Sequence, residues 1–114
     1  MRLIIGITGS TGVIYGVRML EVLKDAGIET HLIMSEWAQK CISMETKHDI
    51  EYVKSLASTV SDEKNMAASV SSGTHKIDGM IVIPCSMKTL SSIANGYDET
   101  LVSRAGGVTL KESR

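Results

Sequence analysis

One stretch near the amino terminus decides the fold: Gly6-Ile7-Thr8-Gly9-Ser10-Thr11-Gly12-Val13-Ile14-Tyr15-Gly16. A short apolar run, residues 2–5, precedes it, and a segment with helical spacing follows it, with Val13, Val17, Leu20 and Lys24 on one face. The order strand, glycine-rich turn, helix is typical of open α/β folds. Glycines let a ligand approach the main chain, and the following helix directs its free N–H groups and positive dipole end to the turn. Ser10 and Thr11 add two hydroxyls, so the stretch predicts a phosphate site.

The spacing of the glycines matches neither of the two common phosphate motifs. No Gly-Lys-Ser/Thr closes the turn as in a P-loop, and glycines at positions 6, 9, 12 and 16 do not form Gly-x-Gly-x-x-Gly. The alternative interpretation is a tight strand-to-helix turn that binds no ligand.

Length and composition indicate one soluble domain spanning residues 1–114. Hydrophobic residues make up 43% and charged residues 22% of the chain, which is ordinary for a globular protein. A net charge of -1 gives no electrostatic footprint for nucleic acid or an anionic membrane. No apolar run approaches the roughly 20 residues of a membrane span, and no signal peptide is visible, which favours a cytoplasmic protein. The two cysteines and three histidines are dispersed, so we expect reduced thiols and no metal site.

The rest of the chain predicts further strand–helix units. Residues 28–34 and 79–84 are apolar enough for strands, and Gly27 is placed to end the first helix. Ser35 is expected to cap a second helix and, at the carboxyl end of a strand, to touch a ligand as well. Residues 49–57 predict a short helix, 58–64 a loop, and Ser86 a cap before a helix that ends at residues 95–96. Three strands are fewer than the five or six of a usual sheet, so the carboxyl end is expected to be incomplete.

Four blocks together resemble the flavin prenyltransferase family, the UbiX-type proteins long described as aromatic-acid decarboxylase subunits. The blocks cover the chain in order: residues 6–18, 29–35, 67–73 and 84–90, with a weaker fifth over 104–112. The resemblance implies a Rossmann-like, flavodoxin-like three-layer sandwich with a parallel sheet, as the FMN-binding two-thirds of the family's domain. It also implies a homo-oligomer that transfers a dimethylallyl group from dimethylallyl phosphate to reduced FMN. The prenylated FMN would serve a UbiD-type decarboxylase.

The resemblance also implies the site residues. The catalytic residues would be Glu45, which we expect to be partly buried, and Thr11. Lys111 would lie near the prenyl phosphate. The FMN contacts would be Gly9, Ser10, Thr11, Gly12, Ser35, Ser86, Met87, Lys88 and Thr89.

Departures from the family pattern leave an alternative function open. The family usually has Ala at position 10, Ala-Asp at 106–107, and about half as much chain again, which would supply a further strand and residues that grip the prenyl phosphate. The alternative is an FMN-binding module or fragment without transferase activity.

Overall fold

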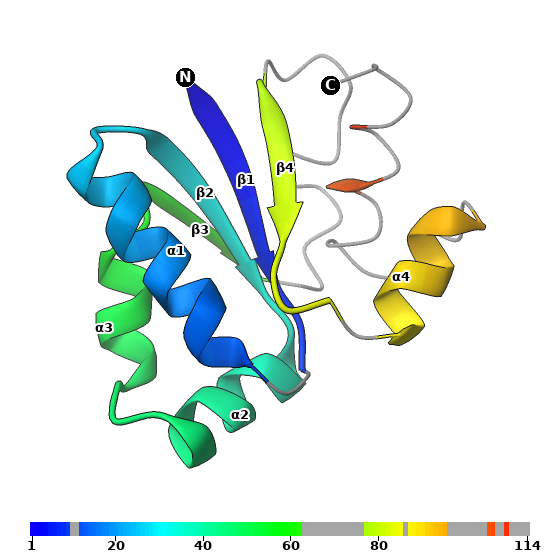
Figure 1. The fold of residues 1–114 in the computed structure, drawn as a ribbon, viewed down its shortest axis with the longest axis horizontal. Helices are drawn as coiled ribbons and strands as arrows, with labels where there is room; N and C mark the ends of the chain where they lie inside the picture. The colour runs from blue at the N-terminus through cyan, green and yellow to red at the C-terminus, as the bar shows by residue number, and fades with distance from the viewer. Residues whose placement is uncertain (10–11, 63–76, 86, 96–104, 107–108, 110–114) are drawn as a thin grey trace.

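The computed structural model describes residues 1–9, 12–62, 77–85, 87–95, 105–106 and 109. Within these described residues, four parallel strands form one sheet, in the order β3-β2-β1-β4 (Figure 1). The strands are β1 (Arg2–Ile7), β2 (Glu29–Met34), β3 (Thr59–Asp62) and β4 (Gly79–Val82), and the helices α1 (Val13–Asp25), α2 (Glu36–Glu45), α3 (Ile50–Ser55) and α4 (Met87–Ala94). The predicted α/β fold with a parallel sheet is therefore confirmed.

The strand β3 corrects the loop that we expected over residues 58–64. It pairs in parallel with β2, with His31 opposite Thr59 and Met34 opposite Asp62. Side chains add to the ladder, because Ser58 Oγ accepts a hydrogen bond from the Thr30 N–H at 3.1 Å. Nε2 of His31 also lies 2.6 Å from Ser61 Oγ. The strand β3 is short and three of its four side chains are polar, so its pairing partner, rather than its own propensity, makes it a strand.

The two faces of the sheet bury separate apolar clusters. On one face, Ile5, Ile7, Leu32 and Met34 pack with the buried sides of α1, α2 and α3. Figure 1 shows α1 and α3 together on that side of the sheet, and α2 below the carboxyl ends of the strands. On the other face, Ile4 and Ile33 pack with Ile77 and Ala105. This division follows from the strand period of two, which sends alternate side chains to opposite faces.

The helix α1 buries Val13, Gly16, Val17, Leu20 and Leu23. Lys24, which we placed on the same face, is exposed, because the buried stripe continues through Leu23 instead. As predicted, Gly27 ends the helix, with φ 73°. The Ile28 N–H donates to Leu23 O and the Gly27 N–H to Lys24 O, each at 3.0 Å, which is the Schellman arrangement.

Gly16 lets α1 pass close to the strand ends. A Cβ atom at residue 16 would lie 2.5 Å from the carbonyl oxygen of Ile83 and 3.0 Å from Cδ1 of Ile7. We expect Gly16→Val to lower the free energy of unfolding by about 2–3 kcal/mol, because backbone and buried side chain would both have to move. Urea unfolding measures this loss. The control is Gly79→Ala, whose Cβ would meet only Leu3 at an ordinary 3.5 Å; an equal loss in both variants contradicts the explanation.

A polar contact joins α1 to α3. The Tyr52 hydroxyl donates a hydrogen bond to Glu21 Oε2 at 2.5 Å, and this bond lowers the pKa of Glu21 and raises the pKa of Tyr52. Because the pKa of Glu21 is depressed in the folded state, its contribution is present above the ordinary value of 4.5 and is lost as the pH falls through the lower folded value.

We therefore expect Tyr52→Phe to melt at a lower temperature than the parent at neutral pH. The difference should shrink as the pH falls below 4.5, where the carboxyl group becomes protonated. Thermal unfolding by circular dichroism at several pH values tests this. A difference that stays constant down to low pH would assign the effect to packing of the ring alone.

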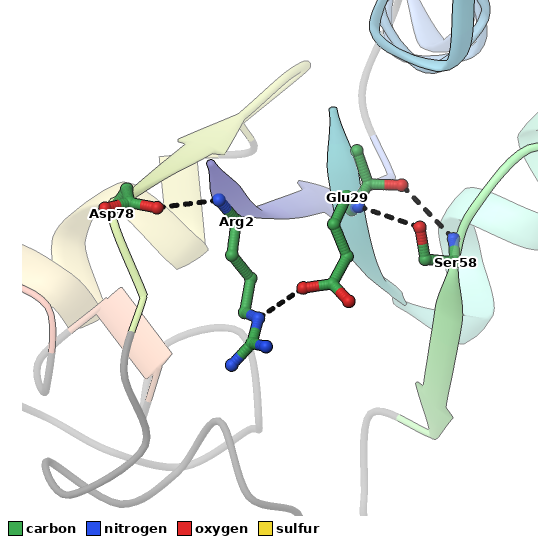
Figure 2. A network of polar contacts seen from close by, with 5 residues as sticks. Arg2, Glu29, Ser58 and Asp78 are labelled. Carbon is green, nitrogen blue, oxygen red and sulfur yellow. Dashed lines mark hydrogen bonds and ion pairs between the residues drawn. The ribbon is translucent and has the colours of Figure 1, made fainter. Parts of the chain in front are cut away.

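The amino ends of the strands are held together by polar side chains (Figure 2). Asp78 Oδ2 accepts a hydrogen bond from the Arg2 N–H at 2.7 Å, and the Arg2 guanidinium pairs with the Glu29 carboxylate. A cavity of about 400 Å³ lies beside these groups, lined also by Met1 and Gly27. Since the Arg2 and Glu29 side chains pair and Asp78 bonds to the main chain of Arg2, we assign this edge a structural role.

Candidate functional site

The strand order places a topological switch point between β1 and β4. From β1 the chain crosses to β2 on one side, whereas β4 pairs with β1 on the other side. Loops at the carboxyl ends of β1 and β4 therefore diverge, and this is the position where open α/β sheets hold ligands. The glycine-rich turn after β1 lies at this point, beside the turn that follows β4.

Hydrogen bonds fix the three strand ends to one another. Buried Thr8 donates from its hydroxyl to Pro84 O at 2.7 Å and from its N–H to the same oxygen at 3.2 Å. The Ile83 N–H donates to Gly6 O at 2.9 Å, and the Ser35 N–H donates to Ile7 O at 3.0 Å. The loops after β1, β2 and β4 thus form one connected platform at the carboxyl edge.

The amino terminus of α1 differs from those of its neighbours. The cap residue before α1 is Gly12, which has φ 99° and supplies no side-chain cap. In contrast, Ser35 Oγ accepts from the Ala38 N–H at 3.0 Å in α2, and Asp49 Oδ1 accepts from the Tyr52 N–H at 2.7 Å before α3. Without an oxygen from its own cap residue, the first turn of α1 is suited to an external anion.

Two exposed aromatic residues border the described ends of the turn. A Cβ atom at Gly9 would lie 2.4 Å from Cδ1 of Trp37, and a Cβ atom at Gly12 would lie 3.0 Å from Cδ2 of Tyr15. Trp37 is 62% exposed and Tyr15 67% exposed. No role was predicted for either ring from the sequence, in which only Gly9 and Gly12 indicate that another group approaches the main chain closely.

The structure brings part of the predicted site together. Gly9, Gly12 and Ser35 lie at the carboxyl edge, and Ser35 has the capping role that we predicted. The predicted residues Ser10, Thr11, Ser86 and Lys111 lie outside the described residues. Met87, Lys88 and Thr89 form the first turn of α4, the helix that follows β4, although their side chains are not described.

Glu45 departs from its expected environment. It is the last residue of α2 and is exposed, which corrects the partial burial that we predicted. The length of α2, about 15 Å at 1.5 Å per residue, separates it from Ser35 at the opposite end. A ligand that touches both residues has to extend along α2.

The two cysteines are free thiols, as predicted, and neither has the low pKa of a nucleophile. Burial and the nearby Glu45 carboxylate raise the pKa of Cys41, and burial raises the pKa of Cys85. Among the described residues, no group of three metal-ligating side chains comes together. None of the described helices is long and apolar enough to cross a bilayer.

Ser35 gives a direct test of the site. We expect Ser35→Ala to destabilise the protein by about 1 kcal/mol through loss of the α2 cap. If the Ser35 hydroxyl also contacts FMN, as the family resemblance implies, the affinity of the variant for FMN falls too. The control is Asp49→Ala, which removes an equivalent cap from α3. Thermal unfolding and ligand titration of both variants separate the two roles. If Ser35→Ala binds the ligand as tightly as Asp49→Ala does, the role of Ser35 is capping alone.

Comparisons with known proteins identify relatives that match nearly the whole of this chain. The probable UbiX-like flavin prenyltransferase of Sedimentibacter hydroxybenzoicus is 56% identical over 115 residues, which is 100% of this chain and 61% of the relative. Flavin prenyltransferase UbiX of Escherichia coli (strain K12) is 49% identical over 114 residues, 99% of this chain and 60% of the relative. The chain thus spans about three fifths of the length of these curated relatives.

Two solved structures have nearly the same fold. The crystal structure of AnUbiX (PadA1) in complex with FMN and dimethylallyl pyrophosphate matches with a TM-score of 0.98 and 46% identity, covering 99% of this chain and 60% of that one. The dodecameric FMN-dependent Ubix-like decarboxylase from Escherichia coli O157:H7 also gives 0.98, with 49% identity over 100% of this chain and 63% of that one. The sequence profile described as Flavoprotein matches residues 1–114. The chain therefore belongs to the flavoprotein family.

Proposed function

We propose that this chain binds FMN at the carboxyl edge of its sheet, with the FMN phosphate at the Gly9–Gly12 turn. We further propose that it provides the FMN-binding part of a flavin prenyltransferase, which transfers a dimethylallyl group from dimethylallyl phosphate to reduced FMN. The observation that carries the proposal is the first turn of α1, which follows Gly12 without a side-chain cap and lies at the switch point between β1 and β4.

The described residues fit the phosphate of FMN. Gly12 has a positive φ and no side chain, so the phosphate can approach the main chain there. The N–H groups at the start of α1 and the positive end of its dipole then face a dianion. Ser35 lies on the same platform, through its hydrogen bond to Ile7. A hydroxyl can cap α2 and still donate its own proton to a ligand.

The remaining proposed contacts divide between binding and chemistry. Ser86 to Thr89, which follow β4 in the sequence, would hold the other side of the cofactor, and Lys111 would bind the prenyl phosphate. When bound, reduced FMN supplies the ring system that accepts the dimethylallyl group. Glu45 and Thr11 are the proposed catalytic residues. In FMN the ribityl chain separates the flavin ring from the phosphate. An FMN molecule whose phosphate binds at the turn can therefore place its ring nearer to the Glu45 end of α2.

The proposed partners follow the same relatives. The solved neighbour holds dimethylallyl pyrophosphate, so both the monophosphate and the diphosphate are substrates to compare. The dodecameric neighbour supports a homo-oligomer for the complete protein. A UbiD-type decarboxylase as consumer of the product, and a cytoplasmic location, remain part of the proposal.

A second candidate function is FMN binding without transfer. The chain spans about three fifths of the length of its curated relatives. In this second candidate, residues 1–114 bind FMN and the residues that grip the prenyl phosphate would lie outside this range.

The test is a binding titration followed by a product assay. FMN and riboflavin are titrated separately, and the chain is then incubated anaerobically with reduced FMN and each dimethylallyl phosphate. Mass spectrometry detects prenylated FMN. A chain extended by the carboxyl-terminal segment of the Sedimentibacter relative is assayed in parallel.

We expect FMN to bind more tightly than riboflavin and the extended chain to form product. Binding without product from the 114-residue chain alone selects the second candidate. Equal affinities for FMN and riboflavin would refute the phosphate placement, and no product from the extended chain would refute the transferase.

A further inference from the structure

We propose that Trp37 positions the phosphate-binding turn by holding the main chain of Gly9. This inference rests on the proposed FMN site and assigns it a residue that the family resemblance did not supply. The residue lies outside the turn, on α2, and acts through its contact with Gly9.

The contact is too close for any side chain at residue 9. A Cβ atom there would lie 2.4 Å from Cδ1, 2.5 Å from Cβ and 2.7 Å from Cγ of Trp37. All three atoms belong to the base of the indole side chain, next to the α2 backbone. Trp37 therefore meets Gly9 with the part of its side chain that has the least freedom to move.

The support for Trp37 is itself rigid. Trp37 is the second residue of α2, between the cap residue Ser35 and the fully buried Ala38. Ser35 is tied to the end of β1 through the Ile7 carbonyl and to α2 through the Ala38 N–H. The sheet thus holds α2, α2 holds Trp37, and Trp37 limits where Gly9 can go.

The outer part of the indole serves a different contact. The side chain is 62% exposed, and the Lys40 ammonium lies 5.2 Å from the ring centroid, one helical turn further along α2. This cation–π pair steadies the ring from its open side. It leaves the base of the side chain against Gly9.

A fixed turn matters for phosphate binding because its donors have to converge on one point. A turn that is already in place loses less conformational freedom when the phosphate arrives. The benefit should be specific to the phosphate, since the segment after β4 is the one proposed to hold the other side of the cofactor.

The experiment compares FMN with riboflavin, which lacks the phosphate, in three variants of the full 114-residue chain. Trp37→Ala removes two of the three contact atoms, whereas Trp37→Phe keeps Cβ, Cγ and Cδ1. Met44→Ala is the matched control, because Met44 is 82% exposed on the same helix, seven residues further along. Dissociation constants come from quenching of flavin fluorescence, and circular dichroism melts report stability.

We expect Trp37→Ala to weaken FMN about tenfold, the equivalent of one charged hydrogen bond, with little change for riboflavin. Trp37→Phe and Met44→Ala should both resemble the parent. A loss of FMN and riboflavin affinity by the same factor would assign Trp37 a purely structural role and overturn the proposal. So would a Trp37→Phe variant as weak as Trp37→Ala, because the indole itself would then be the binding group. A parent chain that fails to favour FMN over riboflavin instead refutes the proposed function.

Discussion

Replacing Gly12 by valine is expected to raise the dissociation constant for FMN about a hundredfold or more. Gly12 has φ 99°, a conformation that a β-branched residue adopts only with strain of about 1–3 kcal/mol. The new Cβ atom would also lie 3.0 Å from the Tyr15 ring and occupy the approach of the phosphate to the first turn of α1. The strain, together with the lost hydrogen bonds, accounts for the expected change in affinity. Titration with FMN measures it directly.

Gly27→Val is the matched control for this experiment. Gly27 also has a positive φ, 73°, but it lies past the opposite end of α1, and an added Cβ atom meets nothing within 4 Å. Both variants should therefore lose similar stability from backbone strain, whereas only Gly12→Val should lose FMN. If Gly27→Val loses FMN to the same degree, the effect comes from general destabilisation and the phosphate does not lie at Gly12.

Glu45→Gln is expected to lower the rate of prenylated FMN formation by roughly 10²–10⁴-fold, the range typical of losing a general acid–base. Glutamine keeps the shape of the side chain and removes the proton-transferring group. Binding of FMN should survive, since Glu45 lies at the end of α2 remote from Ser35 and the proposed phosphate site. The assay uses the chain extended by a relative's carboxyl-terminal segment.

The control for Glu45 is Glu51→Gln, which removes an exposed carboxylate from α3. Its rate should equal that of the parent. If Glu45→Gln also forms product at the parent rate, Glu45 has no catalytic role and is an ordinary exposed carboxylate at the end of α2.

Most of the fold was accessible from the sequence because its elements carry strong local signals. The apolar runs of β1, β2 and β4 and the cap at Ser35 each predicted the observed element. The strand β3 was missed because Thr59–Asp62 has one apolar side chain and no strand pattern of its own. Its pairing with β2 depends on contacts such as His31 with Ser61, which a linear pattern does not display.

The candidate site was only partly accessible for a related reason. The glycines predicted a turn that a ligand can approach. A positive φ at Gly12 and a close contact at Gly9 each require glycine at one position, and a glycine is recognisable in the sequence. The sequence did not reveal which side chain packs against Gly9, because Trp37 lies on α2, 28 positions later in the chain. The exposure of Glu45 likewise depends on where α2 ends in space.

The contact between Trp37 and Gly9 also determines what optical experiments on this protein report. Trp37 is the single tryptophan of the chain, so its emission observes one location, beside the turn and largely in contact with solvent. A denaturation curve recorded by tryptophan emission therefore follows the separation of α2 from the turn. Far-ultraviolet circular dichroism follows the helices as a whole. Coincidence of the two curves would mean that the turn and the sheet lose their structure as one cooperative unit, and an earlier fluorescence transition would mean that the carboxyl edge opens first.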